Sequence, residues 1–428
     1  MAYEQVAIVG LGYVGLPLLL RFSEKGIKVL GLDIDSKKVD SLKAGQSYIK
    51  HISAAQIAAC FADDSRADAS TDFSRISGCD AVIICVPTPL TANREPDMSY
   101  VFGTGGQIAP HLKKGMLVVL ESTTYPGTTD TDLREILEKN SGLRAGEDFH
   151  LAFSPEREDP GNKDFKTSQI PKIVGGLTPV CRDKACELYS LAIDLIVPVA
   201  SCRVAEAIKL TENIFRSVNI AMVNELKIVY EKMGIDIWEV IEGAKTKPFG
   251  FMPFYPGPGL GGHCIPIDPF YLTWKAREYG MPTRFIELAG EVNTAMPAYV
   301  IQRTLLALNS VEKSIKGAKI LIIGLAYKPD VDDDRESPSY ELMAKLEELG
   351  AAVAYHDPHI PVIRPSRHYA RFAGRESVPV TSAEIQGYDL VLISTKHKDV
   401  DYPLISEAAR LVVDTRNALN QSPKVWKA

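Results

Sequence analysis

The feature that most constrains the fold is a glycine-rich turn that joins a short apolar run to an apolar run with helical character. Residues 6–9 form the first run, Gly10-Leu-Gly12-Tyr-Val-Gly15 forms the turn, and residues 16–22 form the second run. This pattern predicts a strand, a tight loop and a helix. Asp33 follows Gly15 by 18 residues, at the end of a second predicted strand over residues 28–32. Together these features match the dinucleotide-binding fingerprint in the context that it requires.

The turn and Asp33 also indicate which dinucleotide is expected. Glycines let the backbone approach a pyrophosphate, and the N-terminus of the following helix supplies partial positive charge. A carboxylate at position 33 accepts hydrogen bonds from ribose hydroxyls and repels a 2′-phosphate. We therefore expect NAD rather than NADP; the alternative is a glycine-rich turn without a ligand.

The rest of the chain shows two α/β patterns around a helical middle. Residues 81–86 and 117–120 continue the first pattern, and strands that alternate with helices predict a parallel, doubly wound sheet. Residues 203–233 contain no glycine or proline and predict one helix about 45 Å long. The Gly/Pro-rich tract at residues 247–269 predicts a long functional loop. A second pattern predicts a helix at 340–349 and four strands, at residues 320–323, 353–355, 390–394 and 411–414.

We therefore predict two Rossmann-like, doubly wound α/β domains joined by a long central helix and a helical middle domain. The expected boundaries are residues 1–200 for the NAD-binding domain, 201–310 for the middle domain, and 311–428 for the second Rossmann-like domain.

Composition narrows the class of protein. Apolar residues make up 46% and charged residues 24% of the 428 residues, which is typical of a globular chain. The formal charge of 48 − 54 = −6 argues against a nucleic-acid partner. A signal peptide begins with basic residues, but no basic residue precedes Arg21. No uncharged apolar run of 18 residues, the length that a membrane-spanning helix needs, occurs in the sequence. We expect a cytoplasmic protein without a membrane partner.

The seven cysteines are scattered and never spaced as CxxC, so we expect neither a disulfide framework nor a metal site. Cys85 lies within a predicted strand and is typical of a small core residue. Cys264 lies in the glycine-rich loop, with His263 before it and Asp268 four residues after it. It is a candidate nucleophile, and a structural thiol in a turn is the alternative.

Lys209 and Asn213 share one helix face at i,i+4 spacing. A pair of this kind usually forms solvated surface, and a functional pair is the alternative.

Beyond these single motifs, the chain resembles the nucleotide-sugar 6-dehydrogenase family over nearly its whole length. The motifs that carry the resemblance occur in the family's order. After the fingerprint they are Val-Pro-Thr88-Pro, Glu-Ser-Thr123-Thr-Tyr-Pro-Gly, Ser154-Pro-Glu156-Arg157, Glu206-Ala-Ile-Lys209-Leu-Thr-Glu-Asn213-Ile-Phe-Arg216, Gly261-Gly-His-Cys264-Ile-Pro-Ile-Asp268 and Gly324-Leu-Ala-Tyr-Lys328-Pro-Asp.

The resemblance implies an enzyme that oxidises the C6 alcohol of a UDP-sugar to a carboxylate with two NAD⁺. By this resemblance Cys264 is the nucleophile, Lys209 stabilises the developing oxyanion, and Asn213 holds the same oxygen or an ordered water. Asp268 would assist a base, and Glu156 and Thr123 would lie near the nicotinamide and the hydrolytic water.

The resemblance also implies two sets of binding residues. The NAD-contacting positions are Gly10, Gly12, Tyr13, Val14, Gly15, Asp33, Lys38, Thr88, Thr123 and Arg335. The UDP-sugar positions are Glu156, Arg157, Glu158, Lys209, Asn213, Arg216, Gly261, Lys328 and Arg416. Because Gly324-Leu-Ala-Tyr-Lys has only one glycine, the second α/β domain is expected to hold uridine rather than a second dinucleotide.

The chain resembles the branch of the family that acts on UDP-N-acetylhexosamines. His263 and Ile267 depart from the glucose-oxidising branch, which argues against UDP-glucose as substrate. We expect UDP-N-acetylglucosamine as substrate, a product that feeds polysaccharide synthesis, and at least a homodimer through residues 203–233. UDP-N-acetylmannosamine, UDP-N-acetylgalactosamine and UDP-glucose are the alternative substrates. A two-electron dehydrogenase without covalent catalysis and a sensor that binds NAD or a nucleotide sugar without turnover are the alternatives of other classes.

Overall fold

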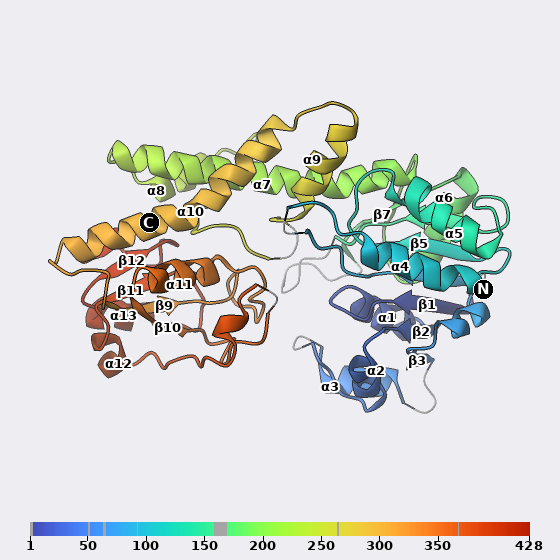
Figure 1. The fold of residues 1–428 in the computed structure, drawn as a ribbon, viewed down its shortest axis with the longest axis horizontal. Coiled ribbons are helices and arrows are strands. Elements are labelled where there is room, and N and C mark those ends of the chain that lie inside the picture. The colour runs from blue at the N-terminus through green and yellow to red at the C-terminus, as the bar shows by residue number, and fades with distance from the viewer. Residues whose placement is uncertain are drawn as a thin grey trace. The chain divides into compact units, whose positions relative to one another are not determined.

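The computed structural model describes residues 3–49, 52–62, 66–91, 93–157, 169–262, 265–366 and 368–428. The chain divides into two compact units. The first consists of Met1–Glu212 with Phe270–Pro282, and the second of Asn213–Pro269 with Thr283–Ala428. Each unit contains one β-sheet with helices around it (Figure 1).

The first unit is built on an eight-stranded sheet with the strand order β3-β2-β1-β4-β5-β6-β7-β8. Its central strands are buried over every residue, which explains why they are continuous apolar runs rather than alternating ones. The strands are β1 (Gln5–Val9), β2 (Lys28–Leu32), β3 (Ala67–Ser70), β4 (Ala81–Ile84), β5 (Leu117–Leu120), β6 (His150–Phe153), β7 (Lys172–Gly176) and β8 (Ile196–Val199).

The expectation of a parallel sheet is correct for β1 to β6 and wrong for the remaining edge. Strand β7 pairs antiparallel with β6, and β8 pairs parallel with β7, so the last two strands run opposite to the others. The sequence predicts no strand at residues 172–176 or 196–199, and antiparallel edge strands are common on parallel sheets. The predicted strand over 81–86 also ends two residues early, at Ile84.

One hydrophobic cluster shows how helices cover this sheet. Side chains of β1, β4 and β5 pack with Leu16, Leu19 and Phe22 of α1 and with Leu188 and Tyr189 of α6. The helices of the unit are α1 (Gly15–Glu24), α2 (Ser36–Lys43), α3 (Ala54–Cys60), α4 (Ser99–Ile108), α5 (Arg134–Ser141) and α6 (Pro179–Ser190). A π-helical segment, Thr128–Leu133, precedes α5.

The predicted long helix is confirmed as α7 (Cys202–Lys232), and it is continuous in Figure 1. Glu206 anchors its first turns to the loop after β5. Its carboxylate accepts hydrogen bonds from the backbone N–H groups of Gly127 at 2.7 Å and Thr129 at 2.9 Å. Burial raises the pKa of Glu206 to about 7.

The second unit contains a five-stranded parallel sheet in the order β10-β9-β11-β12-β13. Alternate residues of β9 enter two different hydrophobic clusters. Ile320 and Ile322 pack with α10 (Arg284–Asn309) and α11 (Pro338–Glu348), and Leu321 and Ile323 pack with α12 (Ser382–Gln386) and α13 (Tyr402–Ala408). Helices therefore cover both faces, as in a doubly wound fold. The strands are β9 (Lys319–Ile323), β10 (Ala352–His356), β11 (Leu390–Ile393), β12 (Val412–Asp414) and β13 (Val425–Lys427).

The remaining helices are α8 (Ile237–Ala244), α9 (Asp268–Glu278), α10 (Arg284–Asn309), α11 (Pro338–Glu348), α12 (Ser382–Gln386) and α13 (Tyr402–Ala408). The described part of the predicted loop at residues 247–269 has no helix or strand before α9 begins at Asp268.

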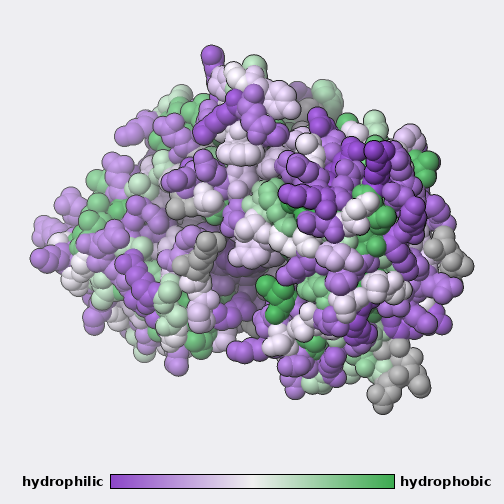
Figure 2. Space-filling model, turned by 45° about the vertical axis from the view of Figure 1, so that its right-hand side comes forward, coloured by the Kyte–Doolittle hydropathy of each residue, from purple (hydrophilic) through white to green (hydrophobic). Residues whose placement is uncertain are grey.

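On the face shown in Figure 2, hydrophilic residues predominate and apolar residues form small separate patches. Among the described residues, no helix is both long enough and apolar enough to cross a membrane.

Candidate functional site

The three glycines of the first turn are needed for different structural reasons. Gly10 has φ +94°, and a Cβ there would lie 2.5 Å from the carbonyl oxygen of Cys85. A Cβ at Gly15 would lie 1.9 Å from the carbonyl oxygen of Gly10. Gly12 is different, because no atom lies within 4 Å of its hypothetical Cβ. The fold itself requires the first and third glycines, whereas the second leaves open space where a pyrophosphate can meet the backbone.

Asp33 supports this turn from the end of β2. Its Oδ2 accepts hydrogen bonds from Leu11 N at 2.9 Å and Lys38 Nζ at 3.0 Å, and its Oδ1 accepts one from Asp35 N at 3.0 Å. A carboxylate offers about four acceptor sites, so these three bonds leave room for a ribose hydroxyl. Tyr13 and Val14 complete the turn and pack against the core. These residues fit a bound NAD, which would supply a hydride acceptor at this site.

The other cofactor positions follow neighbouring strands of the same sheet. Thr88 follows β4, Thr123 follows β5 and Glu156 follows β6. Because β1, β2, β4, β5 and β6 are parallel, their carboxyl ends meet at one edge, where α/β sheets bind ligands. Tyr271 of α9 reinforces this edge, since its hydroxyl donates a hydrogen bond to Thr88 O at 2.9 Å.

Lys209 contacts the segment after β6. Its Nζ donates a hydrogen bond to the backbone carbonyl of Glu156, and the residue is only 7% exposed. Arg157 is also held by protein atoms, because Nη2 lies 2.7 Å from Glu212 Oε1 and Nη1 donates to Pro171 O at 2.7 Å. The structure thus places Glu156, Arg157 and Lys209 together in the first unit.

The second unit brings together Asn213, Asp268 and Arg216. Asn213 is fully buried; its Nδ2 donates a hydrogen bond to Asp268 Oδ2, and its Oδ1 accepts one from Arg216 Nη2. Asp268 is 3% exposed and is the first residue of α9. Lys209 and Asn213 are therefore both buried, which is contrary to the solvated-surface interpretation of their spacing.

The glycine-rich loop is anchored within the second unit. Gly257 N donates a hydrogen bond to Asn224 Oδ1 at 3.0 Å, and a Cβ at Gly257 would lie 2.3 Å from Arg416 Nη1. Arg416 Nε donates to Ser394 O at 2.7 Å, and burial lowers the pKa of the guanidinium to about 10. The loop therefore lies directly against the predicted substrate-binding arginine.

The same loop also contacts the segment that follows β9. A Cβ at Gly261 would lie 2.6 Å from Tyr327 Cβ, and Gly262 N donates a hydrogen bond to Arg335 O at 3.1 Å. The side chain of Arg335 forms two hydrogen bonds with Asp333, at 2.8 and 2.6 Å. Lys328 Nζ lies 5.8 Å from the centroid of the Tyr327 ring.

The second sheet repeats the glycine and aspartate arrangement of the first. Gly324 N donates to His356 O at 2.8 Å, as Gly10 N donates to Leu32 O at 2.8 Å. Asp357 accepts hydrogen bonds from Leu325 N at 2.7 Å and Ala326 N at 2.8 Å. Asp357 Oδ2 also lies 3.1 Å from Nε2 of the buried His397, whereas Asp33 Oδ2 lies 3.0 Å from Lys38 Nζ.

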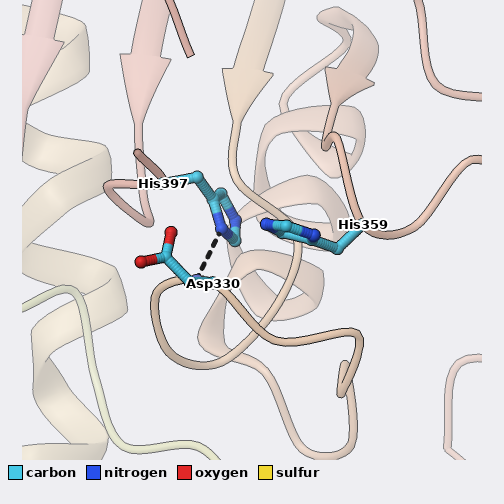
Figure 3. Close-up of side chains that lie close together, drawn as sticks. All are labelled: Asp330, His359 and His397. Atoms are coloured by element: carbon cyan, nitrogen blue, oxygen red, sulfur yellow. Dashed lines mark hydrogen bonds between the residues drawn. The ribbon is translucent and has the colours of Figure 1, made fainter. Parts of the chain in front are cut away.

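Among the described residues, Asp330, His359 and His397 are the one group with metal-ligand atoms that all lie within 4.8 Å of one another (Figure 3). The two rings lie beside each other, with centroids 4.9 Å apart. His397 Nδ1 accepts a hydrogen bond from Asp330 N at 3.0 Å, and Nε2 lies 3.1 Å from Asp357 Oδ2. Both nitrogens of His397 are therefore engaged in supporting the loop after β9.

Three residues of interest, His263, Cys264 and Glu158, lie outside the described residues. Sequence reasoning missed Glu121, Lys172 and Asp357. Glu121 directly precedes the Ser-Thr motif, and Asp357 follows a predicted strand as Asp33 does, so both had a signal that was not used. Lys172 had none, because its partners are distant in the sequence.

Comparisons with known proteins agree with this arrangement. Three models of the UDP-glucose/GDP-mannose dehydrogenase family match the chain: the NAD binding domain at residues 4–193, the central domain at 203–295 and the UDP binding domain at 321–421.

Individual relatives cover most of the chain. It is 36% identical over 396 residues to UDP-N-acetyl-D-glucosamine 6-dehydrogenase of Pseudomonas aeruginosa, covering 92% of this chain and 91% of the relative. It is also 36% identical over 378 residues to UDP-N-acetyl-D-mannosamine dehydrogenase of Escherichia coli K12, covering 86% and 87%. Its structure is similar to that of the UDP-D-ManNAc dehydrogenase of Pyrococcus horikoshii, with a TM-score of 0.88, 30% identity and coverage of 99% and 98%. The chain therefore belongs to the UDP-glucose/GDP-mannose dehydrogenase family and is an NAD-dependent UDP-sugar dehydrogenase.

Proposed function

We propose that this enzyme is a UDP-N-acetylglucosamine 6-dehydrogenase that oxidises the C6 hydroxyl to a carboxylate. The observation that carries the proposal is the burial of Lys209 and Asn213, one helical turn apart on α7. Each side chain has a defined partner: Lys209 binds the segment after β6, and Asn213 binds Asp268, four residues after Cys264. A buried ammonium and a buried amide suit the stabilisation of an oxyanion.

The reaction balances as alcohol, two NAD⁺ and water converted to carboxylate, two NADH and three protons. NAD⁺, which the turn at Gly12 and Asp33 would hold, would supply the hydride acceptor for each of the two oxidations. In the first oxidation we assign the hydroxyl proton to a water molecule assisted by the Asp268 carboxylate, and the Lys209 ammonium stabilises the oxygen as its negative charge develops. An aldehyde has no second hydride to give until a nucleophile adds to its carbonyl, and we assign this step to the Cys264 thiolate.

The second half of the reaction needs a carbon–sulfur bond that forms and then breaks. Addition of the thiolate to C6 gives a thiohemiacetal, and loss of the second hydride gives a thioester. Water then attacks the carbonyl carbon, the C–S bond breaks, and the thiolate leaves. We assign the proton of this water to a carboxylate, Glu156 or Asp268, and the oxyanion to Asn213.

The proposed sugar is supported by the relative named UDP-N-acetyl-D-glucosamine 6-dehydrogenase, which matches over 92% of the chain. UDP-N-acetylmannosamine is the second candidate, because relatives and a solved structure of similar likeness carry that name. The two substrates keep the acetamide and differ in its orientation at C2. UDP-glucose lacks the acetamide, so the protein groups that bind the acetamide would be left without hydrogen bonds.

We predict that UDP-N-acetylglucosamine has a kcat/KM roughly 100-fold or more above that of UDP-glucose, because loss of the acetamide forfeits both methyl burial and hydrogen bonds. The preference over UDP-N-acetylmannosamine is expected to be smaller. Initial rates of NADH production with the three sugars measure both ratios. Equal or better kcat/KM for UDP-glucose would refute the sugar assignment and leave the four-electron chemistry intact.

We further propose a homodimer through α7. Three apolar side chains of this helix, together with Met233 directly after it, are more than 40% exposed and recur at spacings of seven, seven and four residues. This spacing places them along one stripe: Phe215, Met222, Val229 and Met233. An exposed apolar stripe of this kind is typical of a helix that packs against a partner.

We also propose that the uronic acid product is a precursor for polysaccharide synthesis and that the enzyme acts in the cytoplasm. The proposed domain boundaries are residues 1–200, 201–310 and 311–428.

Met222→Glu is expected to convert the dimer to a monomer at micromolar concentration, because it places a charge in the stripe. Sedimentation velocity with NAD present measures this change. Lys232→Gln alters the charge by the same amount at an exposed position of the same helix and should leave the dimer unchanged. A wild-type protein that sediments only as a monomer would contradict the proposal.

A further inference from the structure

An ammonium group is buried between two carboxylates in the first unit. Lys172, the first residue of β7, is 5% exposed. Its Nζ lies 3.1 Å from Glu121 Oε2 and 3.4 Å from Glu156 Oε2. Tyr189 supports this group in two ways: its hydroxyl donates a hydrogen bond to Glu121 Oε1, and its ring centroid lies 5.2 Å from Lys172 Nζ. Four side chains from separate segments thus hold one another in place.

Burying these three charged groups costs free energy, because each of them loses hydration. Burial raises the pKa of Glu121. For Lys172, burial lowers the pKa, but the charges of Glu121 and Glu156 more than offset this, and the net shift is upward. A buried ion pair contributes little net stability compared with apolar residues of similar volume, since both charges lose their hydration. Stability alone therefore gives no reason to retain three charges here.

The geometry shows what the ammonium holds. Glu156 uses both carboxylate oxygens: Oε2 accepts from Lys172 Nζ, and Oε1 accepts from the backbone N–H of Arg157 at 2.6 Å. That N–H belongs to the same peptide unit as the carbonyl of Glu156, which accepts the hydrogen bond from Lys209 Nζ. A trans peptide is planar and its N–H and C=O point in opposite directions. Fixing the N–H therefore fixes the carbonyl that holds Lys209.

We propose that Lys172, held by Glu121, is a positioning residue for Lys209 and acts through the Glu156 side chain and the 156–157 peptide. This inference rests on the proposed function, in which the Lys209 ammonium stabilises the oxyanion. Lys172 needs no contact with the substrate in this role. A loose Glu156 carboxylate would release the peptide and let the Lys209 ammonium move away from the reacting oxygen, and catalysis is sensitive to displacements of this size.

The test needs a variant that removes the tether without adding buried charge. Lys172→Met alone leaves two buried carboxylates without a cation, and it risks unfolding. The double variant Glu121→Gln with Lys172→Met removes one charge of each sign, so the cluster keeps its net charge of −1. Its kcat with UDP-N-acetylglucosamine is expected to fall about tenfold or more, while KM for NAD changes less than about twofold.

Two further variants separate positioning from general structure. Glu121→Gln alone weakens the hold on Lys172 but keeps the Lys172–Glu156 contact, so its loss of kcat should be smaller than that of the double variant. Arg303→Met removes an ion pair with Glu231 in the second unit and should lower thermal stability without lowering kcat. Melting temperatures of all variants, measured by calorimetry, establish that each protein is folded before kinetics are compared.

A double-mutant cycle with Lys209 gives the decisive readout. In a Lys209→Met background, the Glu121→Gln/Lys172→Met change should lower kcat less than about twofold, because the group being positioned is gone. A merely structural role predicts the same tenfold loss in both backgrounds, and that result would overturn the proposal. Wild-type kcat in the folded double variant would overturn it as well. Failure of the proposed function is distinguishable, because the wild-type enzyme would then form no acid from the UDP-sugar.

Discussion

Replacing Cys264 by alanine is expected to abolish formation of the acid, with a loss of roughly 1,000-fold or more. Without a thiolate the aldehyde cannot become a thiohemiacetal, so the second hydride has no route to NAD⁺. The first oxidation needs no thiol, so at most one NADH per sugar is expected from this variant. Mass spectrometry of the product, together with NADH absorbance, measures both effects. Cys264→Ser is expected to trap an ester, because an alkoxide is a poorer leaving group than a thiolate.

The other cysteines supply the control for this experiment. The six that the structure describes are free thiols, and burial raises the pKa values of Cys60, Cys79, Cys85, Cys186 and Cys202. A raised pKa leaves less thiolate, which is the reactive form. Cys186→Ala, at a partly exposed position, should therefore leave acid formation unchanged. Undiminished acid formation by Cys264→Ala would assign the nucleophile elsewhere.

Replacing Lys209 by methionine is expected to lower kcat by roughly 100- to 1,000-fold, because the variant loses a charged donor that stabilises the oxyanion. Methionine keeps much of the side-chain volume, so the packing around α7 is preserved. KM for NAD should change little, since Lys209 is not one of the residues expected to bind NAD, which lie in the glycine turn and at Asp33. Steady-state kinetics with both substrates varied measure kcat and KM separately.

Lys232→Met makes the same substitution at an exposed position at the end of the same helix. It should leave kcat unchanged. A Lys209→Met enzyme with wild-type kcat would remove Lys209 from the chemistry and would favour an active site organised around Asn213 and Asp268 alone.

The sequence predicts those helices, strands and turns that depend on residues close together in the chain. The turn at residues 10–15 is predicted because its three glycines stand between two apolar runs, and α7 is predicted because 31 residues lack a helix breaker. Five strands, β3, β6, β7, β8 and β13, are not predicted, because a polar residue, a glycine or a proline interrupts each short apolar run. Strands β4 and β5, with four residues each, are uninterrupted apolar runs and are predicted.

The residues of the candidate site also divide into those that the sequence predicts and those that it does not. Asp33, Thr88, Thr123 and Glu156 follow strand ends, so motif and topology together place them at one sheet edge. The bonding partners of Lys209 and Asn213 are 53 and 55 residues away in the sequence, and no spacing rule identifies them. Lys172 is the extreme case, because a lysine that begins a short strand has no pattern that predicts burial between two carboxylates.

The central claim is that one enzyme carries out both oxidations on the same sugar through Cys264. Its most direct test is the number of NADH molecules formed for each UDP-N-acetylglucosamine consumed, measured to completion with limiting sugar and excess NAD⁺. The account predicts two NADH for each sugar, together with a uronic acid and no free aldehyde. One NADH for each sugar, with aldehyde accumulating, would contradict it.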